Sequence, residues 1–310
     1  MQIQWFPGHM HKASKQIQEA LPGVDILIEV LDARIPFSSE NPLLAEIRGD
    51  KPCIKVLSKT DLADPEATAL WQAYLEKQQG VKTLAIRTDQ PEKALQLMDL
   101  CRKMMPNKVK NEKTIHTMIV GIPNVGKSTL INTLAGRIIA KTGNEPAVTK
   151  AQQRIKLDDG ITLSDTPGVM WPNVENKNSG YRLAATGAIR DTAMDYTDVA
   201  FYAVDFMAKH YPERLLERYE LDSLPNSELE MLEAIGQKRG CLRGGGQVDL
   251  DRVSKIFITE LRAGTLGLLT LETPEMTEAE KVNVEVIRAD KEAKKAAKKA
   301  ARRKAYRKNR

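Results

Sequence analysis

Eight residues at 121–128, G-I-P-N-V-G-K-S, have the composition and spacing of a loop that binds phosphate. An apolar run at 115–120 precedes them and a helix-compatible stretch at 129–136 follows, which is the context that separates a phosphate loop from a chance match. Backbone N–H groups and the positive end of the helix would face phosphate oxygens. We expect Lys127 to reach the outer two phosphates and the Ser128 hydroxyl to ligate Mg²⁺. The other expected nucleotide contacts here are Asn124, Val125, Gly126 and Thr129.

A second motif, D-T-P-G at 165–168, follows the apolar run 161–164. Asp165 at a strand end can hold the Mg²⁺ shell, and the Gly168 N–H can sense the terminal phosphate. Alone, these four residues would indicate only a turn. About forty residues after a phosphate loop, they predict the second switch of a nucleotide-hydrolysing protein.

The candidate first switch is the segment 143–149, G-N-E-P-A-V-T. We expect the Thr149 hydroxyl to complete the Mg²⁺ shell only when the terminal phosphate is bound. Thr142 and Thr162 are rivals by residue type, and an ordinary polar loop residue is the alternative interpretation.

The base should be read by S-K-T-D at 58–61, which ends the strand-like run 53–57. The Asp61 carboxylate can accept hydrogen bonds from guanine N1–H and the 2-amino group, and adenine offers no matching pair. A K-x-D at a strand end is common by chance, so this assignment depends on the phosphate loop elsewhere in the chain. It predicts GTP and GDP as ligands. The remaining expected base contacts are Ser58, Lys59, Thr60, Arg87 and Thr88.

The base motif precedes the phosphate loop, which reverses the usual order in GTPases. Ligands of open α/β sheets bind outside the carboxyl ends of the strands, so spatial order matters and sequence order is free. Moving the first three strand-like runs to the end restores the usual succession; the six runs are 24–31, 53–57, 81–86, 115–120, 154–157 and 161–164.

We therefore predict an α/β fold: a circularly permuted P-loop GTPase domain at 1–175, with a mostly parallel sheet and helices on both faces. Apolar residues at three- and four-residue spacing predict a small helical domain at 176–277. Its helices are expected near 200–210, 227–237 and 250–261. A basic, disordered tail is expected at 278–310.

Four motifs and the permuted order carry a family resemblance: W-F-P-G-H-M at 5–10, D-A-R-I-P at 32–36, G-I-P-N-V-G-K-S-T-L-I-N at 121–132 and T-G-A-I-R-D at 186–191. From residue 2 to about residue 274 the chain resembles the ribosome biogenesis GTPase A family. The resemblance implies a cytosolic GTPase that docks on an immature large ribosomal subunit and leaves after hydrolysis.

Three residues depart from the family pattern. Ser58 stands where the family's base motif usually has Asn, whose amide braces the loop and touches the base. The shorter hydroxyl leads us to expect weaker nucleotide affinity, with guanine preference retained through Asp61. Ala147 and Lys150 replace the more usual Gly and Thr of the first switch.

Hydrolysis needs a group that orients water, and Val169 and Met170 after the second switch cannot hydrogen-bond water. The permutation brings residues 1–23 to the second switch, and the resemblance also implicates His9 in catalysis. An imidazole with an unperturbed pKa of ~6.5 is mostly neutral at cellular pH and can accept a proton from water. A surface or helix-capping histidine is the alternative.

Asn124 is a candidate ligand for K⁺. In potassium-stimulated GTPases, the equivalent asparagine binds an ion that supplies positive charge at the phosphates. A loop asparagine bonded to its own backbone is the alternative.

Charge is concentrated at the end of the chain. Residues 288–310 contain twelve Lys or Arg and two Asp or Glu, a net +10, so the remainder carries −4 of the total +6. Such a segment binds phosphate backbones by releasing counterions, which favours ribosomal RNA as the partner; a solvated tail or an anionic membrane are alternatives.

Other compositional features fit a cytoplasmic protein. No apolar run approaches the ~20 residues of a membrane span, and the three cysteines are scattered without metal-ligand spacing. The favoured function is a GTP-hydrolysing factor in assembly of the large ribosomal subunit, touching its RNA and also its proteins. The alternatives are a signalling GTPase with a protein target, and an RNA-binding or chaperone protein that binds GTP without hydrolysing it.

Overall fold

The computed structural model describes residue 3 and residues 5–87, 90–140, 153–157 and 160–308 of the chain. Its centre is a six-stranded sheet in the order β3-β2-β1-β4-β6-β5, parallel except for the β5–β6 pair. All six strands begin and end within two residues of the predicted runs. They are β1 (Ile26–Asp32), β2 (Cys53–Ser58), β3 (Val81–Ala85), β4 (Ile115–Val120), β5 (Gln153–Lys156) and β6 (Ile161–Asp165).

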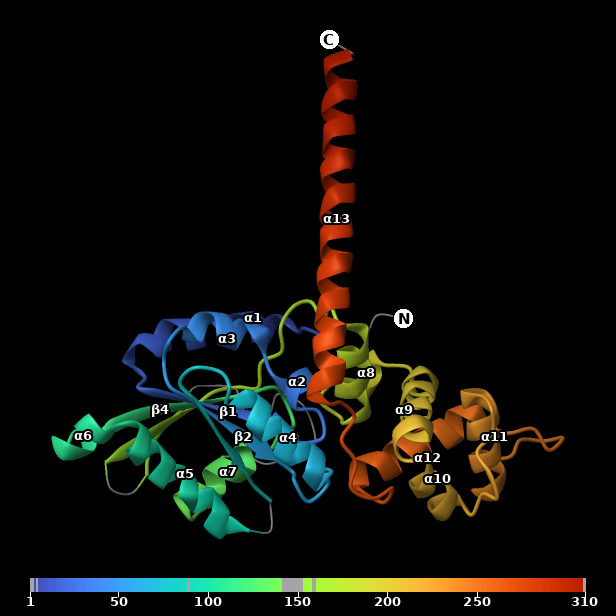
Figure 1. Cartoon of the computed structure of the whole chain (residues 1–310), viewed down its shortest axis with the longest axis horizontal. Helices are drawn as coiled ribbons and strands as arrows, with labels where there is room; N and C mark the ends of the chain where they lie inside the picture. The colour runs from blue at the N-terminus through green and yellow to red at the C-terminus, as the bar shows by residue number, and fades with distance from the viewer. Residues whose placement is uncertain (1–2, 4, 88–89, 141–152, 158–159, 309–310) are drawn as a thin grey trace.

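Helices cover both faces of this sheet. Figure 1 shows α1 and α3 on one side and α5 and α7 on the other. Every residue of β1 and β2 is buried, as expected for parallel strands covered on both faces. The predicted fold class is confirmed. The elements of this region besides the strands are α1 (Gly8–Ala20), η1 (Leu21–Gly23), α2 (Pro36–Ser39), α3 (Pro42–Arg48), α4 (Pro65–Leu75), α5 (Pro91–Met104), α6 (Pro106–Lys110) and α7 (Lys127–Ala135).

A second group of helices lies beside the sheet region in Figure 1, where α9 packs against α8, α10, α11 and α12. The helices expected near 200–210, 227–237 and 250–261 correspond to α9, α11 and α12. The elements are α8 (Lys177–Ala185), η2 (Asp191–Ala193), α9 (Tyr196–His210), α10 (Pro212–Tyr219), α11 (Glu228–Lys238), α12 (Leu250–Ala263) and α13 (Pro274–Lys308). The domain boundaries at 175 and 277 remain predictions.

Proline and capping residues set where many of these helices start. Seven helices, α2 to α6, α10 and α13, have proline as their first residue, where its fixed φ suits the helix and its missing N–H is not needed. Asn41 and Asp64 precede two of them and accept backbone N–H groups of the first turn.

At the end of the chain, α13 continues without a break to Lys308 and projects from the body (Figure 1); the expected disorder of the tail stays a prediction. Alanine and lysine, which favour helix, fill its second half. Its base is also anchored, because Glu280 accepts hydrogen bonds from both terminal nitrogens of the buried Arg182 at 2.8 Å. Asn176 and Asn178 also donate to Glu280.

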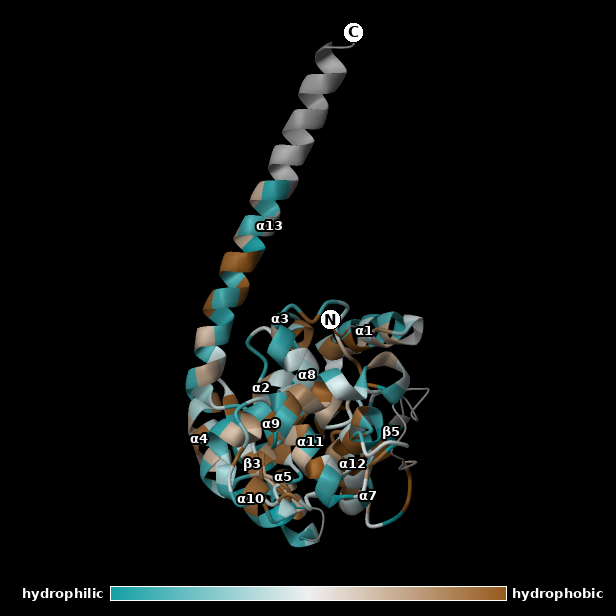
Figure 2. Ribbon diagram, turned by 90° about the vertical axis from the view of Figure 1, so that its right-hand side faces the viewer, coloured by the Kyte–Doolittle hydropathy of each residue, from teal (hydrophilic) through white to brown (hydrophobic). Residues whose placement is uncertain are grey.

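In the coloured part of α13, Figure 2 shows hydrophilic turns on either side of a short apolar stretch. Among the described residues, no helix combines the length and the apolar character needed to cross a lipid bilayer. The three cysteines are buried and unpaired.

Candidate functional site

The phosphate loop lies between β4 and α7 and approaches β1 closely. A Cβ at Gly121, where φ is +149°, would lie 2.6 Å from the Val30 carbonyl oxygen, so only glycine fits. Gly126, also at positive φ, is the N-cap of α7. The start of α7 and its unpaired N–H groups therefore open onto the loop, the geometry that favours anions.

Lys127 and Asp165 are the charged groups of the phosphate side. The Lys127 ammonium donates to the carbonyl oxygens of Gly121 and Ile122 at 2.9 and 2.7 Å. Burial lowers the pKa of Lys127 to about 8, although nearby Asp165 opposes the shift. Burial likewise raises the pKa of Asp165 to about 6 against the charge of Lys127. Each charge is poorly solvated, so a phosphate and a divalent cation would stabilise both.

The second switch packs directly on this loop. A Cβ at Gly168 would lie 3.0 Å from Pro123 backbone atoms and 3.2 Å from the Lys127 nitrogen. The next residue, Val169, donates its N–H to the Gly121 oxygen at 3.2 Å. Gly168 therefore lies against the phosphate loop, and its contact with a terminal phosphate stays a prediction.

The first helix meets the second switch, as the permutation predicts. The Met170 N–H lies 3.5 Å from the sulfur of Met10 in the first turn of α1, and both side chains are fully buried. His9 precedes Met10 in that turn. The backbone around His9 is thus beside the second switch, while the Val169 and Met170 side chains are buried in the core.

The base motif is joined to the phosphate loop by two side chains. The Ser58 hydroxyl lies 2.5 Å from the Val125 oxygen and 2.9 Å from the Leu31 oxygen, and its single proton serves one of them at a time. Lys59, at φ +58°, donates to the Asn124 oxygen at 2.6 Å. Segments more than sixty residues apart therefore meet at the strand ends.

A cleft opens where these segments meet. Its apolar wall comes from α5, α7 and the end of β3, and one Asp61 carboxylate oxygen is buried without a hydrogen-bond partner among the described residues. An unpaired buried acceptor is costly, which fits a site that awaits a donor such as guanine N1–H. The cleft residues are Ser58, Lys59, Ile86, Arg87, Pro91, Ala94, Gly126, Thr129, Leu130 and Thr133.

Other predicted residues are placed as follows. Thr60 closes the motif by donating its hydroxyl to the Ile86 oxygen at 2.9 Å. Ser128 is the second residue of α7. Thr88, Thr142, Thr149, Ala147 and Lys150 lie outside the described residues. Thr162, the other rival for the first switch, is in mid-strand and pairs with His116 Nδ1 at 2.7 Å.

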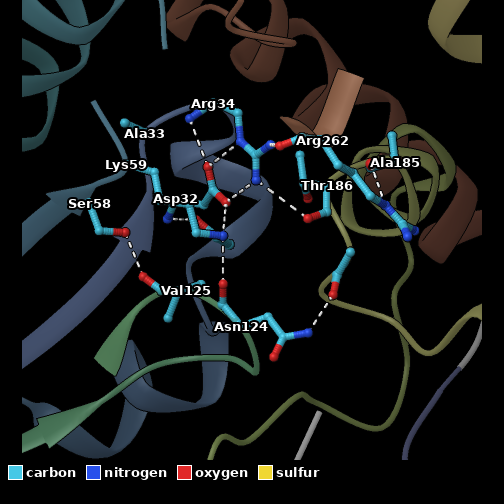
Figure 3. A network of polar contacts seen from close by, with 12 residues as sticks. Asp32, Ala33, Arg34, Ser58, Lys59, Asn124, Val125, Ala185, Thr186 and Arg262 are labelled. Atoms are coloured by element: carbon cyan, nitrogen blue, oxygen red, sulfur yellow. Dashed lines mark hydrogen bonds and ion pairs between the residues drawn. The ribbon is translucent and has the colours of Figure 1, made fainter. Parts of the chain in front are cut away.

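Sequence reasoning did not assign a role to Asp32, which is buried at the end of β1 (Figure 3). Arg34 binds both of its carboxylate oxygens, at 2.9 and 2.7 Å, and Lys59 adds a contact at 2.9 Å. Burial alone would raise the pKa of Asp32, but the two cations outweigh burial and hold it well below its usual range. The signal was an aspartate at a strand end followed by arginine, within the D-A-R-I-P motif used only for the resemblance.

The carboxyl end of α8 connects this network to the helical region (Figure 3). Four successive carbonyl oxygens accept side-chain donors from three places: Ala184 and Ala185 from Arg262 at 2.8 and 3.1 Å, Thr186 from Arg34 at 3.4 Å, and Gly187 from Asn124 at 2.8 Å. Side chains from the phosphate loop, from the end of β1 and from α12 thus all bond the carboxyl end of α8, which we call the α8 joint.

Known proteins resemble this chain over most of its length. Residues 116–235 match the family described as "50S ribosome-binding GTPase". Ribosome biogenesis GTPase A from Bacillus cereus is 47% identical, covering 93% of this chain and 99% of that protein. Its namesake from Thermotoga maritima is 30% identical over 88% of this chain and 95% of its own length. The crystal structure of GNP-bound YlqF from T. maritima matches with a TM-score of 0.62 and 28% identity, over 86% of this chain and 99% of that one.

Proposed function

The chain belongs to the ribosome biogenesis GTPase A family, and from this premise we propose that it hydrolyses GTP to GDP and phosphate while assisting assembly of the large ribosomal subunit in the cytoplasm. The observation that carries the proposal is the contact of the base motif with the phosphate loop, Ser58 with Val125 and Lys59 with Asn124. These contacts bring Ser58, Lys59 and Gly126 into the lining of one cleft, and we propose that the phosphates bind towards Lys127 and the base towards Asp61.

Each end of this cleft has a defined task. Lys127 and the start of α7 bind the phosphates, and Gly168 responds to the terminal one. At the other end, Asp61 selects guanine, and the wall of the cleft, including Ile86 and Leu130, encloses the flat base.

A divalent cation fits the phosphate end, since Asp165 is a buried carboxylate beside Lys127 whose ionised form lacks solvation. Ser128, Asp165 and Thr149 are the proposed Mg²⁺ ligands. When bound, Mg²⁺ supplies positive charge that stabilises the charge developing on the transferred phosphoryl oxygens.

Asn124 is the proposed K⁺ ligand. Its amide nitrogen donates to Gly187, so an ion held by its side chain would also act on the α8 joint. Turnover measured in K⁺ and in Na⁺ at equal ionic strength should be faster in K⁺; equal rates reject the assignment.

His9 is the proposed group that orients the attacking water. The support is its place beside Met10, which contacts the second switch, together with the buried, apolar Val169 and Met170. His9→Ala should lower kcat about 10²-fold or more, the usual range for a general base, with little change in GTP affinity. His11→Ala, an exposed histidine two residues away, is the matched control.

We propose that α13 contacts ribosomal RNA through its basic second half. Full-length protein should sediment with large-subunit precursors when loaded with a non-hydrolysable GTP analogue and separate from them with GDP. Changing Lys294, Lys295, Lys298 and Lys299 to Gln keeps helix-forming residues and should reduce the salt slope of binding by roughly 0.7–0.9 for each phosphate that the helix no longer neutralises.

Two outcomes would replace this proposal. Salt-insensitive binding to another protein without co-sedimentation would indicate a signalling GTPase. Single-turnover assays without phosphate release would indicate an RNA-binding or chaperone protein that uses GTP only as a structural ligand.

A further inference from the structure

Asn41 lies between α2 and α3 and is 1% exposed. Its side chain and its backbone N–H bond three separate segments. Its Oδ1 accepts the Leu43 N–H at 3.0 Å and caps α3, and its backbone N–H donates to the Glu29 carboxylate at 3.1 Å. Its side-chain Nδ2 donates to the Val169 carbonyl oxygen at 2.9 Å. Only the last of these bonds leaves the β1–α3 region, and it reaches the second switch.

Val169 is thereby held at both of its backbone polar groups. Its N–H is bonded to Gly121 in the phosphate loop and its carbonyl to Asn41. The preceding residue is Gly168, which packs against Pro123 and Lys127. A glycine has wide conformational freedom, so the turn depends on its neighbours to keep one conformation. Asn41 lies outside the phosphate loop and bonds the carbonyl of Val169 itself, whereas Met10 of α1 contacts only the following residue, Met170.

The Asn41 side chain is itself fixed. The Glu29 carboxylate that accepts its backbone N–H is 2% exposed and lies in β1, a fully buried strand at the centre of the sheet. The cap bond to Leu43 orients the amide, so that Nδ2 faces the second switch. The donor to Val169 is consequently positioned by the core of the sheet and not by a loop.

We propose that Asn41 is a positioning residue for GTP: its amide holds the Gly168–Val169 turn against the phosphate loop, where the turn can meet a terminal phosphate. This inference rests on the proposed function. Asn41 should strengthen the binding of GTP more than that of GDP, because GDP lacks the phosphate that the turn would meet.

The test uses Asn41→Ser in the full-length protein. Serine is also a strong N-cap, so α3 keeps its cap, but its short hydroxyl cannot span the distance to Val169. Affinities for GDP and for a non-hydrolysable GTP analogue are measured by equilibrium binding, and kcat and KM by phosphate release. We expect analogue affinity to fall about tenfold relative to GDP affinity, and kcat to fall.

Controls separate positioning from general destabilisation. Ser227→Ala removes the cap of α11 in the helical region and should leave the ratio of the two affinities unchanged. Asn41→Thr repeats the test with a second capping residue in case the serine variant does not fold. Equal losses of GDP and analogue affinity, or an unchanged ratio, overturn the inference. Absence of nucleotide binding by the unaltered protein would instead refute the proposed function.

Discussion

The phosphate side and the base side of the cleft are built differently. On the phosphate side, Lys127 and Val169 bond backbone carbonyls of the loop itself, within one stretch of about fifty residues. On the base side, Ser58, Lys59 and Asp32 are side chains at the ends of two separate strands. A phosphate site can therefore be formed locally, whereas the base site depends on the assembled sheet. This difference explains why the base motif can precede the phosphate loop in the sequence while both sites still form.

The largest expected effect tests whether the base side depends on the buried Asp32 network. Arg34→Met should destabilise the fold by about 3–5 kcal/mol, because it removes the main partner of a buried carboxylate. Urea unfolding gives the free energy of unfolding. Arg137→Met, at an exposed position, should change it by no more than about 0.5 kcal/mol. An equally small change for Arg34→Met would mean that the Asp32 network does not stabilise the base side of the cleft.

A smaller effect is expected on nucleotide binding, where substitutions on the base side and on the phosphate side should change GTP and ATP affinity differently. Asp61→Ala should weaken GTP binding by about 1.5–3 kcal/mol and leave ATP binding almost unchanged, since only guanine uses the carboxylate. Lys127→Ala should weaken GTP and ATP binding alike, because both carry the same phosphates. Competition titrations with the two nucleotides give both numbers. If Asp61→Ala weakens ATP as much as GTP, the base side does not read the base.

The smallest effect concerns pH and is confined to the phosphate side. The pKa of Lys127 in the free protein is about 8 because of burial, and a bound phosphate would raise it. Binding then takes up a proton above pH 8, so GTP affinity should fall by at most about tenfold per pH unit there. Below about pH 6, Asp165 takes up a proton, and Mg²⁺-dependent affinity should fall as well.

The variant Lys127→Arg checks this interpretation. Arginine stays protonated throughout this range, so the loss of affinity above pH 8 should disappear. Both proteins experience the same titration of the nucleotide, and the difference between their profiles from about pH 5 to 9 isolates Lys127. Identical profiles would show that another group titrates.

The sheet was predictable because its strands are buried runs of apolar residues that end in polar motifs. The same logic located Lys127, Asp165 and Gly168, whose spacing is local. The Asp32–Arg34 pair was not assigned a role, since its partners Lys59 and Thr186 come from distant segments that only the fold brings together. The Asp32–Arg34 pair has a local signal in the D-A-R-I-P motif, but the bonds to Lys59 and Thr186 have none.

Ser58 shows how chemistry at one position can be kept by a different group. The sequence predicts that its hydroxyl lacks the bracing that an asparagine amide gives. The hydroxyl nevertheless reaches the Val125 oxygen, because the end of β2 lies directly against the phosphate loop. The weaker nucleotide affinity expected from Ser58 stays a prediction. A lost contact between β2 and the phosphate loop is not its reason, because the Ser58 hydroxyl makes that contact.

Because α13 is held at its base and projects from the body beyond it, a small rotation at the base would move its far end by a much larger distance. At 1.5 Å per residue, the part of α13 from Glu280 to Lys308 extends about 42 Å, and a tilt of about 10° about Glu280 would move the far end by roughly 7 Å. The helix would turn about Glu280, which accepts hydrogen bonds from Arg182, Asn176 and Asn178, all within the fourteen residues that follow the second switch. A small displacement of the residues that hold Glu280 would therefore become several times larger at the far end of α13.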